Sequence, residues 1–162
     1  MAFWDKYKLE VADNLGIIWT TLIQEDSAAG TTTTLVGSGN PIQFEFYGSD
    51  DPFDQPIMGS KAVIEVMAST SFVYSDLFTS ANLKYKVIIK QGSTVFWNGW
   101  ILANNYQEPY DCTPFPVQLV ATDGLGLLSD FNFEDLLYTA RQKTSVVIYD
   151  ILSLVGITTF TE

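Results

Sequence analysis

The stretch Trp97–Leu125, WNGWILANNYQEPYDCTPFPVQLVATDGL, decides the fold class. It begins as an alternating strand, continues through an aromatic- and proline-rich crossing, and ends in a second strand that leads into a tight turn. Trp97 and Trp100 flank Gly99, where we expect a β-bulge or the close approach of a second backbone. A strand, a rigid crossing and a returning strand indicate sheet architecture rather than a set of reactive side chains.

Apolar residues also alternate with polar ones through most of the chain before this stretch. The expected strands cover residues 7–12, 16–24, 42–47, 61–68, 83–90, 94–103 and 117–122. Asp13–Gly16 and Gln91-Gly92 are expected as tight turns, and Ser75–Phe78 as a helical turn. About seven strands with short links predict a mainly β domain over residues 1–125, and the pattern is typical of an antiparallel barrel or sandwich. Of these we expect an antiparallel barrel or split barrel.

The pattern changes in residues 126–162. Thr144-Ser145 is a candidate helix N-cap, and Gly156 lies where a C′ glycine belongs. Between them, apolar residues recur at helical spacing: Ile148, Ile151, Leu152 and Val155. The last residues are typical of the start of a strand. We therefore expect a short helical element and the start of a further segment, which makes the chain the N-terminal part of something longer.

Composition excludes several classes of function. The formal net charge is −11, from 19 acidic and 8 basic residues, and a surface this negative disfavours tight binding of nucleic acid. The chain has no histidine, which removes imidazole bases, Ser-His-Asp and Cys-His arrangements and histidine metal ligands. The single cysteine, Cys112, excludes an internal disulfide and a cysteine-based zinc site. We expect no catalytic activity, no cofactor and no membrane segment.

Two loops offer a ligand-binding alternative to an ordinary turn. The loop at residues 50–56 contains three aspartates whose oxygens could bind Ca²⁺, namely Asp50, Asp51 and Asp54. Pro52, Pro56 and the missing EF-hand spacing favour a rigid solvated loop instead. Residues 37–41, GSGNP, are glycine-rich, but they lack the lysine and the strand-to-helix context of a phosphate loop. We predict an ordinary turn there.

The crossing contains one pair of acids that could be imagined as catalytic. Glu108 and Asp111 bracket Pro109 and Tyr110, and paired carboxylates are the groups that cleave glycosides. Nothing in their spacing singles them out, so a polar crossing is the preferred interpretation.

Aromatic residues are the main candidates for contacts with other molecules. Eleven phenylalanines, eight tyrosines and four tryptophans exceed what one small core needs. An exposed tryptophan could stack on sugar or lie in a subunit interface, whereas the alternative for Trp97 and Trp100 is one in the core and one at its boundary. The candidate subunit-interface aromatics are Trp97, Trp100, Tyr106 and Tyr110.

The order of motifs resembles the N-terminal region of tail-hub or baseplate-hub proteins encoded by phages and prophages of Bacteroidetes. The matching segments are YKLEVADNLG (7–16), GSGNPIQFEF (37–46), PIMGSKAVIEV (56–66), SDLF (75–78), FWNGWI (96–101) and YQEPYDCTPFPVQLVATDGLGLL (106–128). The likeness covers most of residues 7–155. Its most specific part is a GWI strand followed by EPY and then A-x-DGL.

The resemblance implies a virion structural protein rather than an enzyme. Such hubs place β-barrel domains in a ring around the tail axis and link the tube to the tip or to receptor-binding parts. The implied partners are further copies of the chain and other tail proteins, and the implied location is the virion tail after synthesis in the host bacterial cytoplasm. An acidic lumen would let DNA pass without binding it tightly.

Two other classes of function stay open at this point. A carbohydrate- or receptor-binding β module would need a solvent-exposed aromatic platform. A carboxylate-only glycoside or peptidoglycan hydrolase would need two carboxylates facing each other across a cleft.

Overall fold

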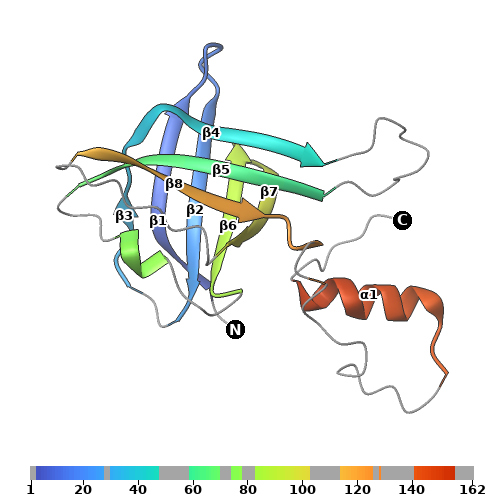
Figure 1. The fold of residues 1–162 in the computed structure, drawn as a ribbon. Helices are drawn as coiled ribbons and strands as arrows, with labels where there is room; N and C mark the ends of the chain where they lie inside the picture. The colour runs from blue at the N-terminus through green and yellow to red at the C-terminus, as the bar shows by residue number, and fades with distance from the viewer. Residues whose placement is uncertain are drawn as a thin grey trace. The chain divides into compact units, whose positions relative to one another are not determined.

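The computed structural model describes residues 3–27, 30–47, 59–69, 74–77, 83–102, 114–125, 128 and 141–155 (Figure 1). The chain divides into two compact units, Met1–Asp123 and Gly124–Glu162, which are described separately below. The first unit contains the described strands and the second contains the described α-helix. The expectation of a mainly β chain with a short C-terminal helix is confirmed.

The described strands of the first unit form one eight-stranded sheet. They are β1 (Phe3–Ala12), β2 (Ile18–Asp26), β3 (Thr33–Thr34), β4 (Gly37–Tyr47), β5 (Gly59–Ala68), β6 (Tyr85–Gln91), β7 (Thr94–Ile101) and β8 (Phe115–Thr122). The order across the sheet is β3-β1-β2-β6-β7-β8-β5-β4. The β1–β3 pair is parallel and the other pairs are antiparallel, so the sheet is mixed rather than purely antiparallel. The described sheet is not closed into a barrel, because β3 and β4 are its edges.

The core lies between two groups of strands. In Figure 1, β4, β5 and β8 run across the direction of β1, β2 and β6. Alternate residues of each strand point inward, which is why their apolar period of two predicted the strands. Fully buried side chains come from both groups: Leu9, Ile23 and Ile89 from one, and Ile64 and Leu119 from the other.

Residues just before β4 bond to both β1 and β5. The backbone N–H of Leu35 donates to the carbonyl oxygen of Lys8 in β1 at 2.7 Å. The next residue, Val36, accepts a hydrogen bond on its carbonyl oxygen from the N–H of Met67 in β5 at 2.8 Å. One short segment therefore connects two strands that lie far apart in the sheet order.

The first part of β4 is irregular. Gly37 opposes Val66 and Ile42 opposes Ile64, so residues 38–41 bulge out of the ladder. The prediction of an ordinary turn at residues 37–41 is therefore wrong, because this segment belongs to β4. Pro41 has no N–H to give to a ladder, and a bulge is a place where a strand tolerates that loss.

The turns agree with the sequence to within one residue. The expected β1–β2 turn is confirmed, with the N–H of Asp13 bonded to the carbonyl of Ile17 and Gly16 at φ +77°. The β6–β7 loop is Gly92-Ser93 rather than Gln91-Gly92, because Gln91 still pairs with Thr94. The helical turn expected near residues 75–78 is the 3-10 helix η1 (Tyr74–Leu77).

Gly99 is a close-approach point, as the sequence predicts. A Cβ at this position would lie 2.1 Å from the carbonyl oxygen of Thr122, so only glycine fits. The irregularity of β7 lies elsewhere, at Phe96, where the β6–β7 register shifts by one residue. This bulge decides which aromatic side chains of β7 face the surface.

The second unit contains helix α1 (Thr144–Leu154). Its N-cap is Lys143, which has an extended backbone and makes no side-chain capping bond, so the predicted Thr144-Ser145 cap was wrong. The carbonyl oxygen of Lys143 accepts the first hydrogen bonds of the helix, from the N–H groups of Val146 and Val147. Thr144 is therefore the first residue of the helix. Gly156 lies outside the described residues. In the described part of the chain, no helix has the length and apolar character needed to cross a membrane.

Candidate binding groove

A groove with a volume of about 520 Å³ opens beside β4 in the first unit. Its walls come from the end of β1, the start of β2, the bulged part of β4 and the bulge of β7. The side chains that shape it most are Val11, Trp19, Ile42, Phe44 and Phe96. Four of them, Val11, Trp19, Ile42 and Phe44, also pack against the core, so the groove is a place where the core reaches the surface.

Three aromatic rings form the apolar floor of this groove. The ring centroids of Trp19 and Phe96 lie 5.1 Å apart at an interplanar angle of 78°, and those of Phe44 and Phe96 also lie 5.1 Å apart. Trp19 packs edge-to-face on Phe96 and Phe44 packs tilted against it, and these contacts hold the rings in defined positions. Phe96 nevertheless remains 50% exposed. The floor is therefore ordered and yet open to contact with another molecule.

Among the described residues that line the groove, Asp13 alone is charged. Its Oδ1 accepts hydrogen bonds from the N–H groups of Leu15 and Ile17, both at 2.9 Å, and its Oδ2 accepts one from the indole of Trp19 at 3.2 Å. The bond from Ile17 is the main cause that lowers the pKa of Asp13, and the bonds from Trp19 and Leu15 act in the same direction. Asp13 is thus a fixed, solvent-facing anion. The amide side chains of Asn14 and Asn40 complete the polar rim.

Further apolar side chains are exposed close by in the sequence. Leu15 at the tip of the β1–β2 hairpin is 85% exposed, and Phe46 and Tyr47 at the end of β4 are 62% and 53% exposed. Phe46 follows Phe44 by two residues and so lies on the same face of β4. Exposed apolar surface of this kind commonly marks a site of interaction with another molecule.

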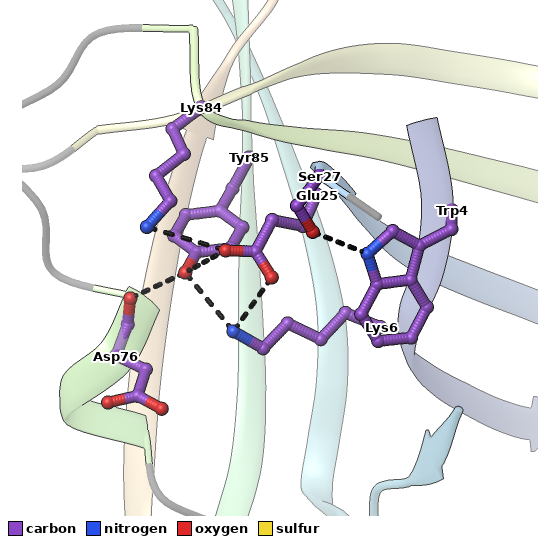
Figure 2. Close-up of polar contacts among 7 residues, drawn as sticks. All are labelled: Trp4, Lys6, Glu25, Ser27, Asp76, Lys84 and Tyr85. Carbon is purple, nitrogen blue, oxygen red and sulfur yellow. Dashed lines mark hydrogen bonds and ion pairs between the residues drawn. The ribbon is translucent and has the colours of Figure 1, made fainter. Parts of the chain in front are cut away.

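A second cluster, shown in Figure 2, joins β1, β2 and β6 through ionisable side chains. The Lys6 ammonium lies 3.0 Å from Glu25 Oε2, and that of Lys84 lies 3.3 Å from Glu25 Oε1. The Tyr85 hydroxyl oxygen lies 2.8 Å from the Asp76 carbonyl oxygen and 3.2 Å from Glu25 Oε1, and these two acceptors share its one proton. Nearby, the Trp4 indole donates to Ser27 Oγ at 2.8 Å.

The electrostatics of this cluster favour a structural role. Burial alone would lower the pKa of Lys6, but its hydrogen bonds to Glu25 and Tyr85 outweigh burial, and the pKa is raised. Burial alone would raise the pKa of Glu25, but the hydrogen bond and charge of Lys6 outweigh it, and the pKa is lowered. A carboxylate held ionised between two ammonium groups is a poor general base at neutral pH. The cluster instead ties three strands and η1 together.

The two tryptophans proposed as interface residues are buried within the chain. Trp97 is 7% exposed and belongs to the core, where its indole donates to Ser60 Oγ at 2.9 Å. Trp100 is 6% exposed and packs edge-on against Phe3, with ring centroids 5.6 Å apart. Both side chains are thus buried within the single chain, whereas Phe96 at the bulge is 50% exposed. A role of Trp97 and Trp100 in a subunit interface stays a prediction.

The remaining candidates from the sequence lie outside the described residues. They are Tyr106, Tyr110, Glu108, Asp111, Asp50, Asp51 and Asp54. One feature of the sequence lies at the groove, namely the segment GSGNP before the alternating aromatic residues of β4. The bulge that this segment forms depends on its pairing with β5, which the sequence alone does not indicate. Within the described ranges, no three acidic or cysteine side chains gather where they could hold a metal ion. Comparison with protein-family models, curated proteins and solved structures found no match.

Proposed function

We propose that this chain is a structural subunit of a phage or phage-like tail assembly, in the hub, baseplate or tail tip. In this role it forms a ring around the tail axis and links the tube to tip components. The observation that carries the proposal is the exposed apolar surface of β4, where Phe46 and Tyr47 lie at the edge of the sheet. An edge strand with exposed aromatics favours association with another chain. The resemblance to hub proteins supplies the type of assembly.

We further propose that the first unit is a split barrel. Support comes from the hydrogen bonds that Leu35 and Val36 make to β1 and β5, which join the second strand from each end of the sheet order to one segment. From there β1 and β4 diverge, and the groove lies between them. The split would leave an open seam where a closed barrel would have a ladder.

We also propose that the chain is not an enzyme and that its acidic surface faces a channel. The Glu25 cluster is neutralised by two lysines, which leaves it poorly suited to proton transfer. A net charge of −11 would repel the phosphate groups of DNA, so DNA would pass through the channel without binding tightly. Locating the acidic side chains on the outer rim of an assembled ring would contradict the channel proposal.

A matched pair of variants tests the assembly role. Phe46→Ser removes an exposed aromatic from β4, whereas Val36→Ser removes a side chain that is equally exposed but lies before β4. We expect Phe46→Ser to shift the chain towards smaller species in sedimentation velocity, and Val36→Ser to leave the distribution unchanged. Equal behaviour of both variants and the wild type would contradict a contact through β4.

A carbohydrate-binding module is the second candidate. The groove favours it because aromatic rings lie beside Asn14, Asn40 and Asp13, and sugars are bound by ring stacking combined with polar side chains. A glycan array probed with the wild type and with Phe96→Ser separates the candidates. Glycan binding that Phe96→Ser abolishes would favour this function over assembly, and absence of glycan binding would favour assembly. No observation on the described residues favours a hydrolase.

A further inference from the structure

The pairing register shows which backbone groups of β4 face away from β5. Ser60 in β5 directs its carbonyl towards β8, where it accepts a hydrogen bond from the N–H of Asp123 at 3.1 Å. Phe46 opposes Ser60, so its own N–H and C=O point to the outer edge of β4. Because these groups alternate between the two edges of a strand, Phe44 and Ile42 share this direction. Among the described strands, β4 pairs with β5 alone.

Strand β1 presents a second edge to the same space. The carbonyl of Lys8 points to the β3 side, where it bonds to Leu35. The same alternation directs the backbone groups of Glu10 and Ala12 to that side, beyond the last residue of the two-residue strand β3. The groove contains Ala12 on one wall and Phe44 on the other. It is therefore flanked by two rows of backbone donors and acceptors.

The groove also offers contacts for side chains. A strand added to β4 would lie about 4.8 Å from it and would direct every second side chain towards Trp19, Phe44 and Phe96. Strand addition generally gains affinity from main-chain hydrogen bonds and specificity from such alternate contacts. The volume of about 520 Å³ is sufficient for several side chains of this kind.

The negative charge at the groove determines which kind of added strand would bind there. Among the described residues that line the groove, the half-buried Asp13 is the charged one, and the chain carries a net charge of −11. A basic group on the incoming strand would be attracted, and an acidic one repelled. A second copy of this chain would bring the same net negative charge, and its described edge strands, β3 and β4, contain no lysine or arginine to pair with Asp13.

We propose that the groove binds an extended segment of a partner protein, which adds to the edge of β4 with alternate apolar side chains and places a lysine or arginine beside Asp13. This inference rests on the proposed assembly function: the copies of the chain meet at Phe46 and Tyr47, which do not line the groove, and the groove receives the segment of another tail protein. Its test uses peptide binding by the isolated chain, whereas the assembly role is tested by mass, so the two can fail separately.

The probe is a synthetic peptide of about seven residues, with valine or isoleucine alternating with threonine and two lysines at one end. Control peptides have the same composition in scrambled order, a proline at the centre, or glutamates in place of the lysines. Isothermal titration measures affinity, and amide hydrogen exchange measures protection. We expect saturable binding of the alternating peptide alone, with new protection at Ile42 and Phe44. Saturable binding to none of the peptides, or equal binding of the scrambled one, would overturn the proposal.

Two variants locate the binding. Phe96→Ser should weaken binding by about tenfold or more, whereas Val95→Ser, at a residue of equal exposure that does not line the groove, should leave it unchanged. Asp13→Asn keeps an oxygen for the N–H groups of Leu15 and Ile17 but removes the charge, and should weaken binding about threefold at low salt. Unchanged affinity in both Phe96→Ser and Asp13→Asn would contradict the proposal. So would a self-associated wild type that Phe96→Ser converts to monomers, because a second copy would then be the occupant.

Discussion

The indole N–H of Trp97 donates a hydrogen bond to Ser60 Oγ across 2.9 Å, although the two residues lie 37 positions apart in the chain. Ser60 Oγ in turn donates to Asp123 Oδ2 at 2.9 Å, and the Ser60 N–H bonds to the same oxygen. Strands β5, β7 and the end of β8 are thus joined by one small hydroxyl side chain. Trp97 and the Asp-Gly turn at Asp123 therefore serve the architecture.

Ser60→Ala should destabilise the fold by about 1–3 kcal/mol, because it leaves the buried Trp97 indole without its acceptor. Urea denaturation followed by tryptophan fluorescence measures the change. Ser93→Ala in the exposed β6–β7 loop is the control and should change stability by less than about 0.5 kcal/mol. Equal stability of both variants would contradict the role of Ser60.

Gly99→Ala should be among the most damaging small substitutions in the chain. Its Cβ would lie 2.1 Å from the Thr122 carbonyl oxygen, so β7 and β8 would have to separate. We expect a loss of about 3 kcal/mol or more, or failure to fold. Gly39→Ala is the matched control, since a Cβ there meets no atom within 4 Å. A wild-type melting temperature for Gly99→Ala would refute the close approach.

The ion-pair cluster predicts a dependence of stability on pH at both extremes. Glu25 has a lowered pKa in the folded chain, so its contribution is present above the unfolded pKa and is lost as pH falls through the folded pKa. Lys6 has a raised pKa, so its contribution is complete below the unfolded pKa and is lost as pH rises through the folded pKa.

Glu25→Gln should therefore lower stability at neutral pH by about 1–3 kcal/mol and flatten the acid limb of the pH profile. Chemical denaturation at a series of pH values measures both effects. Glu10→Gln breaks a more exposed pair with Lys8 and should cost less than about 0.5 kcal/mol. An unchanged acid limb in Glu25→Gln would show that this cluster does not set the pH dependence.

Thr21→Val should stabilise the chain by about 1 kcal/mol. Thr21 is buried, and its Oγ1 has no hydrogen-bond partner among the described residues. Replacing an unsatisfied hydroxyl by a methyl group of similar size removes a desolvation cost. Thermal denaturation of Thr21→Val beside Thr20→Val, on the neighbouring and less buried position, checks this expectation. A lower melting temperature for Thr21→Val would indicate that the hydroxyl is satisfied.

The strands were predictable because they are half buried, and burial of one face leaves a period of two in the sequence. The bulge at Gly37–Pro41 could not be predicted from the sequence, because its glycines and proline are typical of a turn. The segment is a bulge because of its pairing with β5. The exposure of Phe96 follows from a register shift that no local pattern encodes. The burial of Trp100 could not be predicted either, because it depends on packing against Phe3, a residue distant in the sequence.

We propose that this chain is an assembly subunit, and its mass in solution is the property that depends on this role. Native mass spectrometry over a range of concentrations, with electron micrographs of the same sample, gives both copy number and symmetry. We expect a closed ring whose mass is a whole multiple of the 18.0 kDa chain. A stable monomer of 18.0 kDa at every concentration would contradict it.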